Sequence, residues 1–126
     1  MLSEALLCIA LNVWHEARGE PFEGQVAVAE VTRRRVEDPR WPDTACDVVY
    51  QPWQFSWTMF DMPEPSPSSP SWRKAVQAAR ESRTSSVTSC SDHYYNPDEA
   101  NPAWASSPYA EEELVIGGHR FLCIPW

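Results

Sequence analysis

The sequence predicts an α+β fold, mainly helical, with a small antiparallel β-element near the C-terminus. Apolar residues recur at three- and four-residue spacing through residues 2–17, 23–36 and 71–82, which is the period of an amphipathic helix. Two apolar runs then flank Gly117-Gly118, a pattern typical of a β-hairpin. The length of 126 residues suits one hydrophobic core, so we expect a single domain over residues 1–126.

The first predicted helix spans residues 2–17, with Ser3 as a candidate N-cap. Gly19 and Pro21 are expected to end it. Glycine suits a left-handed C-cap, and proline cannot continue the hydrogen-bonded ladder.

The second helix is predicted over residues 23–36. Its last turn carries Arg33-Arg34-Arg35, whose positive charges favour the negative end of the helix dipole. A short helix is expected to end at Val49, with either Asp43 or Thr44 as its N-cap.

Residues 51–70 form a long irregular segment, and a loop of this length in a compact domain is usually functional or disordered. We expect residues 54–58 to form the wall of a cleft and residues 63–70 to form a mobile insertion. The next helix is predicted over residues 71–82, with Ser71 as its N-cap.

A short strand is predicted over residues 92–96, followed by a loop and then the hairpin of residues 114–124. Successive side chains of a strand point to opposite faces. Tyr94 and Asn96 are therefore expected on one face and Tyr95 on the other.

The formal net charge of −8 and the pI of about 4.7 argue against a nucleic-acid partner, because phosphate binding needs a basic surface. Seven tryptophans are present, and such rings commonly line clefts that bind small molecules. No Lys or Arg precedes the first apolar run, and Glu4 interrupts it. We therefore expect neither a signal peptide nor a membrane span, so that the chain is made in the cytoplasm without its own export signal.

The four cysteines show no Cys-x-x-Cys spacing, which argues against a zinc knuckle. Free thiols are the favoured prediction, with Cys8 as a small buried hydrophobe. One disulfide, between Cys46 and Cys90, stays open as an alternative.

Glu16 is expected in the last turn of the first helix, beside Trp14 and His15. The negative end of the helix dipole and the flanking aromatic rings both disfavour a carboxylate there, so both raise the pKa of Glu16. A raised carboxyl pKa suits a general acid. The alternative from composition alone is a solvated glutamate before a helix break.

Five blocks of residues, taken together and in this order, resemble the SleB-type cell-wall hydrolases. The resemblance runs from about Ala5 to Phe121. The blocks are Asn12–Val28 with its Glu-Ala-Arg-Gly-Glu-Pro core, Arg40–Thr44, Gln54–Trp57, His93–Pro97 and Ile116–Phe121.

This resemblance implies a lysozyme-like domain that cleaves the β-1,4 glycan strand of peptidoglycan between MurNAc and GlcNAc, as a lytic transglycosylase. Glu16 matches the family's catalytic glutamate, and no cofactor is implied. A catalytic domain without an export signal or a wall-binding domain resembles a phage or prophage endolysin. Such a protein acts as a monomer on the wall outside the membrane after release by a membrane-permeabilising holin.

Tyr95 is the residue expected to assist Glu16, by orienting its carboxyl or stabilising the transition state. Residues expected to contact substrate are Gln25, Gln54, Phe55, Ser56, Tyr94 and Asn96. Core packing is the alternative role for Gln25 and Phe55.

Three rival functions stay open. A muramidase would need a second carboxylate, for which Glu20 is the candidate. A metal-dependent amidase or peptidase would use His15-Glu16 with Glu20, His93 and His119, although Gly19 stands where a His-Glu-x-x-His motif requires its second histidine. A non-catalytic wall-binding module would need no acid with a raised pKa.

Overall fold

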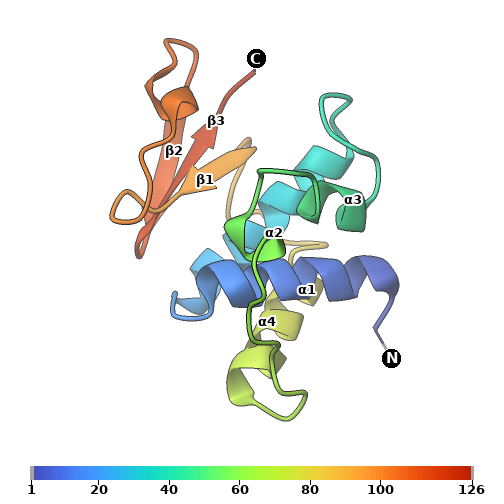
Figure 1. Ribbon diagram of the computed structural model, residues 1–126. Coiled ribbons are helices and arrows are strands. Elements are labelled where there is room, and N and C mark those ends of the chain that lie inside the picture. Colours follow the sequence, from blue (N-terminus) through green and yellow to red (C-terminus); the bar gives the residue numbers. More distant parts are fainter. Residues whose placement is uncertain (1, 126) are drawn as a thin grey trace.

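The computed structural model describes residues 2–125 and confirms the mainly helical α+β architecture. Within this range the helices come first, and they are α1 (Glu4–Ala17), α2 (Phe22–Val36), α3 (Ala45–Val49) and α4 (Pro70–Glu81). The strands β1 (His93–Tyr95), β2 (Glu111–Ile116) and β3 (His119–Cys123) follow. Short 3-10 helices, η1 (Ser56–Thr58) and η2 (Ala103–Ser106), lie in the connections. Figure 1 shows α1 across the middle of the molecule, α4 against it, and the sheet at one end.

Helix α1 begins as predicted and ends differently. The Ser3 hydroxyl accepts a hydrogen bond from the Leu6 N–H at 3.1 Å, which confirms this N-cap. The C-cap is Arg18, in right-handed conformation with φ of −62°. The predicted left-handed Gly19 is therefore wrong. Among the described glycines, the positive φ belongs to Gly117, in the hairpin turn.

Helix α4 begins one residue earlier than predicted. Ser69, not Ser71, is its N-cap, and the Ser69 hydroxyl accepts from the Trp72 N–H at 3.2 Å. Pro70 then occupies the first turn, where its fixed φ suits the helix and its missing N–H leaves no donor unpaired. The Ser71 hydroxyl instead accepts from Trp14 Nε1 at 3.0 Å and joins α4 to α1.

The three arginines at the end of α2 connect it to the rest of the fold. Arg33 donates to the Ala79 carbonyl at 2.9 Å, and Arg34 to the Thr88 hydroxyl at 3.1 Å. Arg35 is buried and donates to the Asp92 carbonyl at 2.7 Å. These side chains lie in the last turn as predicted, and they also fix α4 and the segment before β1 against α2.

The short helix α3 is capped by Thr44, one of the two predicted candidates, whose hydroxyl accepts from the Asp47 N–H at 3.1 Å. Residues 54–58 contain η1 and alternate in exposure: Gln54 and Ser56 are exposed and Phe55 is buried. The mobility predicted for residues 63–70 stays a prediction.

The hydrophobic core lies between the helices and the inner face of the sheet, and its members include Ile9, Val13, Val28, Val31, Ala78 and Phe121. The sheet order is β1-β3-β2, antiparallel throughout, and Tyr94 pairs with Phe121. This register turns the Tyr94 side chain toward the helices. No helix within residues 2–125 is both long and apolar enough to cross a membrane.

The cysteine predictions were wrong, because all four cysteines are paired. Cys8 of α1 is joined to Cys46 of α3, and Cys90 to Cys123 at the end of β3. Each bridge follows from packing between segments more than thirty residues apart, which sequence spacing alone does not specify. Disulfides persist in oxidising compartments, outside the reducing cytosol.

Candidate active site

The Glu16 side chain lies in the last turn of α1 and reaches toward β1. Its carboxyl is half-buried, and Oε1 accepts a hydrogen bond from the Tyr94 hydroxyl at 3.3 Å. The helix holds Glu16 from one side and the register of the sheet holds Tyr94 from the other. Two elements far apart in sequence therefore fix the position of one carboxyl group.

Behind Tyr94, a chain of hydrogen bonds runs through the interior. Trp57 Nε1 donates to Asn12 Oδ1 at 2.9 Å, and Asn12 Nδ2 donates to the Tyr94 hydroxyl at 3.2 Å. Asn12 is fully buried, so this network satisfies its amide and fixes the direction in which Tyr94 donates. Every donor in the chain points toward Glu16.

Burial raises the pKa of Glu16 from 4.5 to about 7, in the direction that the sequence predicts. Loss of water is the largest cause, the hydrogen bond from Tyr94 acts the other way, and the negative charge of Glu99 raises the pKa further. Burial also holds the pKa of Tyr94 well above 10, so its hydroxyl stays protonated. Near pH 7 Glu16 is thus divided between acid and carboxylate, which suits a group that gives and then takes a proton.

Glu20 fixes the hairpin to the junction between α1 and α2. Its Oε1 accepts from the Gly118 N–H at 2.8 Å. A Cβ at Gly117 would lie 2.1 Å from the same oxygen and would displace this carboxylate, and the φ of 56° favours glycine there. The carboxylate of Glu20 is thereby engaged in holding the β2–β3 turn.

The structure brings Tyr94, not Tyr95, to Glu16. Tyr95 points to the other side of β1, where its ring packs edge-on against Trp104 with centroids 5.5 Å apart. The alternation of faces along the strand is as predicted, and pairing with β3 decides which face turns inward. The Phe55 ring packs against Tyr94 at 6.1 Å and is buried, so it supports Tyr94 rather than facing solvent.

Gln25, expected to bind substrate, is fully buried. Its Nε2 donates to the Glu20 carbonyl at 3.2 Å, whereas its Oε1 has no hydrogen-bond partner among the described residues, so its role in substrate binding stays a prediction. Gln54 and Ser56 are exposed, and Gln54 Oε1 accepts from Arg35 at 3.1 Å. Asn96 is half-buried, and its Oδ1 accepts from the Asp98 N–H at 2.9 Å.

Asn12 is the important site residue that the sequence reasoning missed. It lies four residues before Glu16, and residues four apart share one face of a helix. A buried amide on the same face as the acid was therefore a detectable signal. Trp57 lies in the predicted cleft wall of residues 54–58, but its place in this network, which begins at its indole N–H, is not among the predictions.

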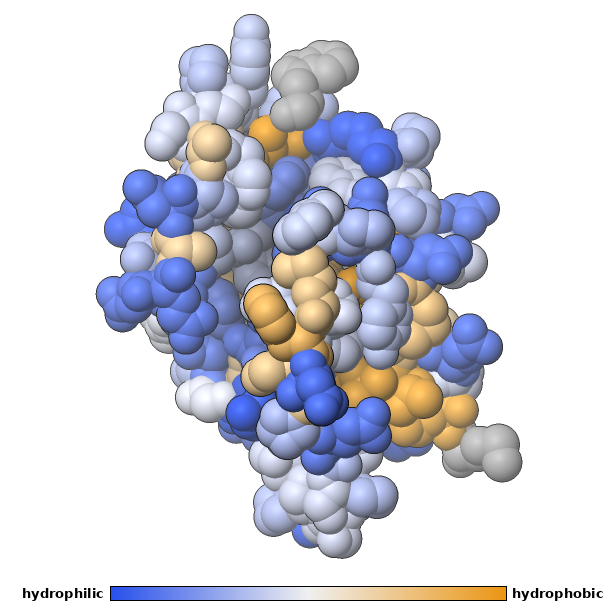
Figure 2. All heavy atoms as spheres, viewed as in Figure 1, coloured by the Kyte–Doolittle hydropathy of each residue, from blue (hydrophilic) through white to orange (hydrophobic). Residues whose placement is uncertain are grey.

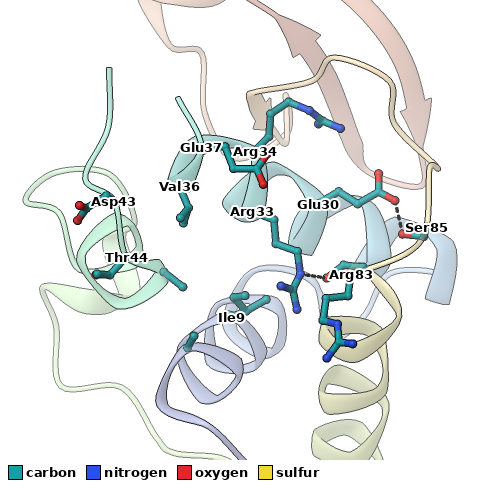
Figure 3. Close-up of a pocket in the computed structure, with 13 residues that line it drawn as sticks. Ile9, Glu30, Arg33, Arg34, Val36, Glu37, Asp43, Thr44, Arg83 and Ser85 are labelled. Atoms are coloured by element: carbon teal, nitrogen blue, oxygen red, sulfur yellow. Dashed lines mark hydrogen bonds between the residues drawn. The ribbon is translucent and has the colours of Figure 1, made fainter. Parts of the chain in front are cut away.

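A cavity of about 590 Å³ lies near the other end of α1 (Figure 3). Ala5 and Ile9 of α1 line it, together with Arg33 and Glu30 of α2. Figure 3 shows Glu30 reaching toward Ser85 and Arg33 lying next to Arg83. Arg33 donates to the Ala79 carbonyl, and Glu30 accepts from the Thr88 N–H at 2.7 Å. Because neighbours satisfy these charges, the cavity offers weaker acid–base chemistry than the Glu16 site.

The residues of the metal-dependent alternative have other contacts. His93 Nδ1 bonds to Asp92 at 2.8 Å, and Glu20 holds the hairpin turn. In the described part of the chain, the group with metal-ligating spacing is Cys90, Glu113 and Cys123, and its sulfurs form a disulfide. This geometry gives the metal alternative no support.

Comparison with known proteins relates this arrangement to a family. The chain matches the Cell Wall Hydrolase family over residues 19–122, a region that begins three residues after Glu16. It is 33% identical over 114 residues to a spore cortex-lytic enzyme of Halalkalibacterium halodurans, covering 90% of this chain and 33% of that enzyme. The Bacillus subtilis spore cortex-lytic enzyme is 34% identical over 96 residues, covering 76% of this chain and 30% of the enzyme. The chain thus spans about a third of the length of these relatives.

Solved structures agree over nearly the whole chain. The catalytic domain of the Bacillus cereus SleB protein superposes with a TM-score of 0.75 and 29% identity, covering 96% of this chain and 91% of that domain. The catalytic domain of the germination-specific lytic transglycosylase SleB from Bacillus anthracis gives a TM-score of 0.68 and 26% identity, with 95% of each chain covered. The sequence and structural matches show that the chain belongs to the Cell Wall Hydrolase family, of the SleB type that its motifs predict.

Proposed function

We propose that this chain cleaves the β-1,4 glycan strand of peptidoglycan between MurNAc and GlcNAc as a lytic transglycosylase. The observation that carries the proposal is a single half-buried glutamic acid, Glu16, with a pKa of about 7 and a fixed hydroxyl donor, Tyr94, on one carboxyl oxygen. The similarity to a domain described as a lytic transglycosylase supports the same reaction.

In the proposed reaction Glu16 first acts as the acid. It donates its proton to the glycosidic oxygen as the bond from that oxygen to the muramic C1 breaks. The resulting carboxylate then takes the proton from the muramic C6 hydroxyl, and O6 bonds to C1 to close a 1,6-anhydro ring. The proton lost in the first step is regained in the second, so no water is consumed. Tyr94 keeps Oε1 occupied throughout and so positions the carboxyl.

Hydrolysis by a muramidase mechanism is the weaker candidate. It needs a second carboxylate about 5–9.5 Å from the first, depending on the stereochemical course. Glu20 is the sequence-based candidate, but its carboxylate is hydrogen-bonded to Gly118 in the hairpin turn. One acid that acts twice suits the geometry better. Among the predicted substrate contacts, the exposed Gln54 and Ser56 and the half-buried Asn96 remain proposed sugar ligands.

The test is to digest purified peptidoglycan and determine fragment masses, with and without EDTA. We expect anhydro-muropeptides in both conditions, and a loss of about 10²- to 10⁴-fold in rate for Glu16→Gln, the range that general acid–base catalysis contributes. Reducing-end muramic acid would indicate hydrolysis. Free stem peptides that disappear on chelation would support the metal-dependent alternative, and bound but intact wall would indicate a binding module.

Action outside the membrane is consistent with the family and with two disulfides, which form in oxidising compartments. We further propose that the chain acts as an endolysin released by a holin. The curated relatives are spore cortex-lytic enzymes, which gives a second possible role. Co-expression with a holin distinguishes the two. Lysis that requires the holin and intact Glu16 supports an endolysin, and cleavage restricted to spore cortex supports the other role.

A further inference from the structure

Trp53 has an unusual backbone conformation for its residue type. Its φ is +68°, in the left-handed region that favours glycine, and it is the non-glycine residue with positive φ in the described chain. A bulky side chain is strained there because its Cβ approaches the neighbouring carbonyl. Strain of this kind persists where the surroundings enforce it, and it is found preferentially at functional sites.

The Trp53 side chain does not regain this cost by packing. It is 83% exposed, the most exposed of the large apolar side chains that the structure describes. A structural tryptophan would bury most of its ring. The combination of strain and exposure therefore indicates that the ring is held outward for contact with something else.

The segment that carries Trp53 is fixed to the Glu16 site. Trp57, four residues later, donates to Asn12 in the network, and its ring stacks on His15 with centroids 4.2 Å apart and planes 9° apart. Tyr50, three residues before Trp53, packs edge-on against the same Trp57 ring at 5.5 Å. The two sides of the turn thus pack against each other, and Trp57 anchors the turn to the end of α1.

The same segment is visible on one face of the molecule. In Figure 1 it runs from α3 in front of α1 toward α4. Figure 2 shows apolar side chains gathered in the middle of that face. Exposed apolar side chains on this segment, besides Trp53, are Met59, Phe60 and Met62. An exposed apolar patch of this kind is typical of a binding surface.

We propose that Trp53 is a glycan-binding residue, whose indole face stacks on a pyranose ring of the peptidoglycan strand beyond the two sugars that flank the cleaved bond. The occupant follows from continuity with the Glu16 site, so the inference rests on the proposed function. The C–H face of a pyranose is apolar and buries well against an aromatic ring. Such a contact holds a long strand and has no part in proton transfer.

The test separates the ring from the strain by substituting Trp53 with Phe, Ala or Gly. Each variant is made in the inactive Glu16→Gln protein, so that peptidoglycan sacculi stay intact during the measurement. Trp53→Phe keeps both features, Trp53→Ala keeps the strain, and Trp53→Gly removes both. Affinity for sacculi is measured by sedimentation, and stability is measured as the urea midpoint.

We expect affinity for sacculi to depend on whether an aromatic ring is present at position 53. We expect stability to depend on whether the residue there is strained by its positive φ. Trp53→Phe stays within about threefold of the parent Kd. Trp53→Ala and Trp53→Gly raise the Kd by about tenfold, since burying the apolar face of one sugar ring is worth on the order of one decade. The urea midpoint rises for Trp53→Gly alone. Tyr109→Ala, which removes a 59% exposed aromatic from another segment, is the matched control and keeps the parent Kd.

Equal Kd values for all four proteins would overturn the inference, as would failure of the Glu16→Gln parent to sediment with sacculi. A Kd that rises equally in the Tyr109→Ala control would also overturn it. The proposed reaction is judged separately, by the fragments that the protein with native Glu16 releases. If the expected Kd differences are missing but anhydro products are still released, the role of Trp53 is wrong and the proposed reaction is not affected.

Discussion

Glu16 of α1 is half-buried and Glu30 of α2 is buried, and the two carboxyl groups have very different hydrogen-bond partners. Glu30 of α2 is 4% exposed and borders the large cavity. Its carboxylate accepts hydrogen bonds from Ser85, Val87 and both the N–H and hydroxyl of Thr88. Glu16 accepts one, from Tyr94. Protein donors take the place of water around the Glu30 carboxylate, whereas the Glu16 carboxyl has a single such donor.

The two carboxyl groups differ in how many protein donors surround them, and this difference supports Glu16 as the proposed acid. Four donors hold the carboxylate of Glu30, which thereby joins the segment before β1 to α2. Loss of water raises the pKa of Glu16 to about 7, and its one hydrogen bond, from Tyr94, offsets only part of that rise. If cavity volume is the criterion, the candidate site lies next to Glu30. If the criterion is a carboxyl group with few hydrogen-bond donors, the candidate is Glu16. For the proposed proton transfer, the second criterion is the relevant one.

The largest expected effect is on stability, in Glu30→Gln. The amide would present an N–H₂ group to donors that now face an oxygen, and charge-assisted hydrogen bonds contribute about 1.5–3 kcal/mol each. We expect a loss of about 3 kcal/mol in the free energy of unfolding, measured by urea denaturation, with the rate per folded molecule preserved. A variant that keeps its stability and loses its activity would reverse the roles assigned to the two glutamates.

The second prediction concerns Glu16→Gln, which should stabilise the protein above pH 7. The folded-state pKa is raised, so the contribution of the protonated acid is fully present below about pH 4.5 and is lost as pH rises through 7. Allowing for solvent screening of a half-buried group, we expect a gain of about 2 kcal/mol at pH 8 and little at pH 4. Unfolding midpoints across that range measure it, and a pH-independent difference would contradict the raised pKa.

The third prediction is a change in both rate and pH profile for Tyr94→Phe. The hydrogen bond from Tyr94 lowers the pKa of Glu16, so its removal raises that pKa further. The activity that depends on the protonated acid should then persist to higher pH. Loss of carboxyl positioning should reduce kcat by about tenfold, equivalent to roughly 1.4 kcal/mol. Tyr95→Phe on the opposite face is the matched control, and an equal effect there would argue against Tyr94.

The sequence predicts those features whose causes are local. A helix end and a motif predict Glu16 as the acid. Residue type predicts the caps Ser3 and Thr44, because a cap bonds to backbone within three residues. The prediction of Ser71 as the cap is wrong because Ser69 caps the helix and Pro70 already occupies its first turn. Local rules therefore predict most helix ends and the position of Glu16, the proposed acid.

Features that depend on tertiary pairing were beyond these rules. Strand alternation separates Tyr94 from Tyr95, but pairing of Tyr94 with Phe121 decides which of them meets Glu16. The bridge from Cys8 to Cys46 depends in the same way on α1 packing against α3. The burial of Gln25 also needs the hairpin to lie over the helix junction. The partner of the acid was thus harder to predict than the acid itself.

The smallest expected effect tests whether the network acts through Tyr94 or only through packing. Trp57→Phe keeps an aromatic ring against His15 and removes the donor to Asn12, a hydrogen bond worth about 1 kcal/mol. If the network positions Tyr94, kcat falls by about two- to threefold and the pH profile shifts in the same direction as in Tyr94→Phe. The double variant then shows less than the product of the two single effects, because neighbours that share a network are not additive. If Trp57→Phe loses stability with an unchanged pH profile, Trp57 has only a packing role. Tyr94 would then be the residue that positions the Glu16 carboxyl without help from the network.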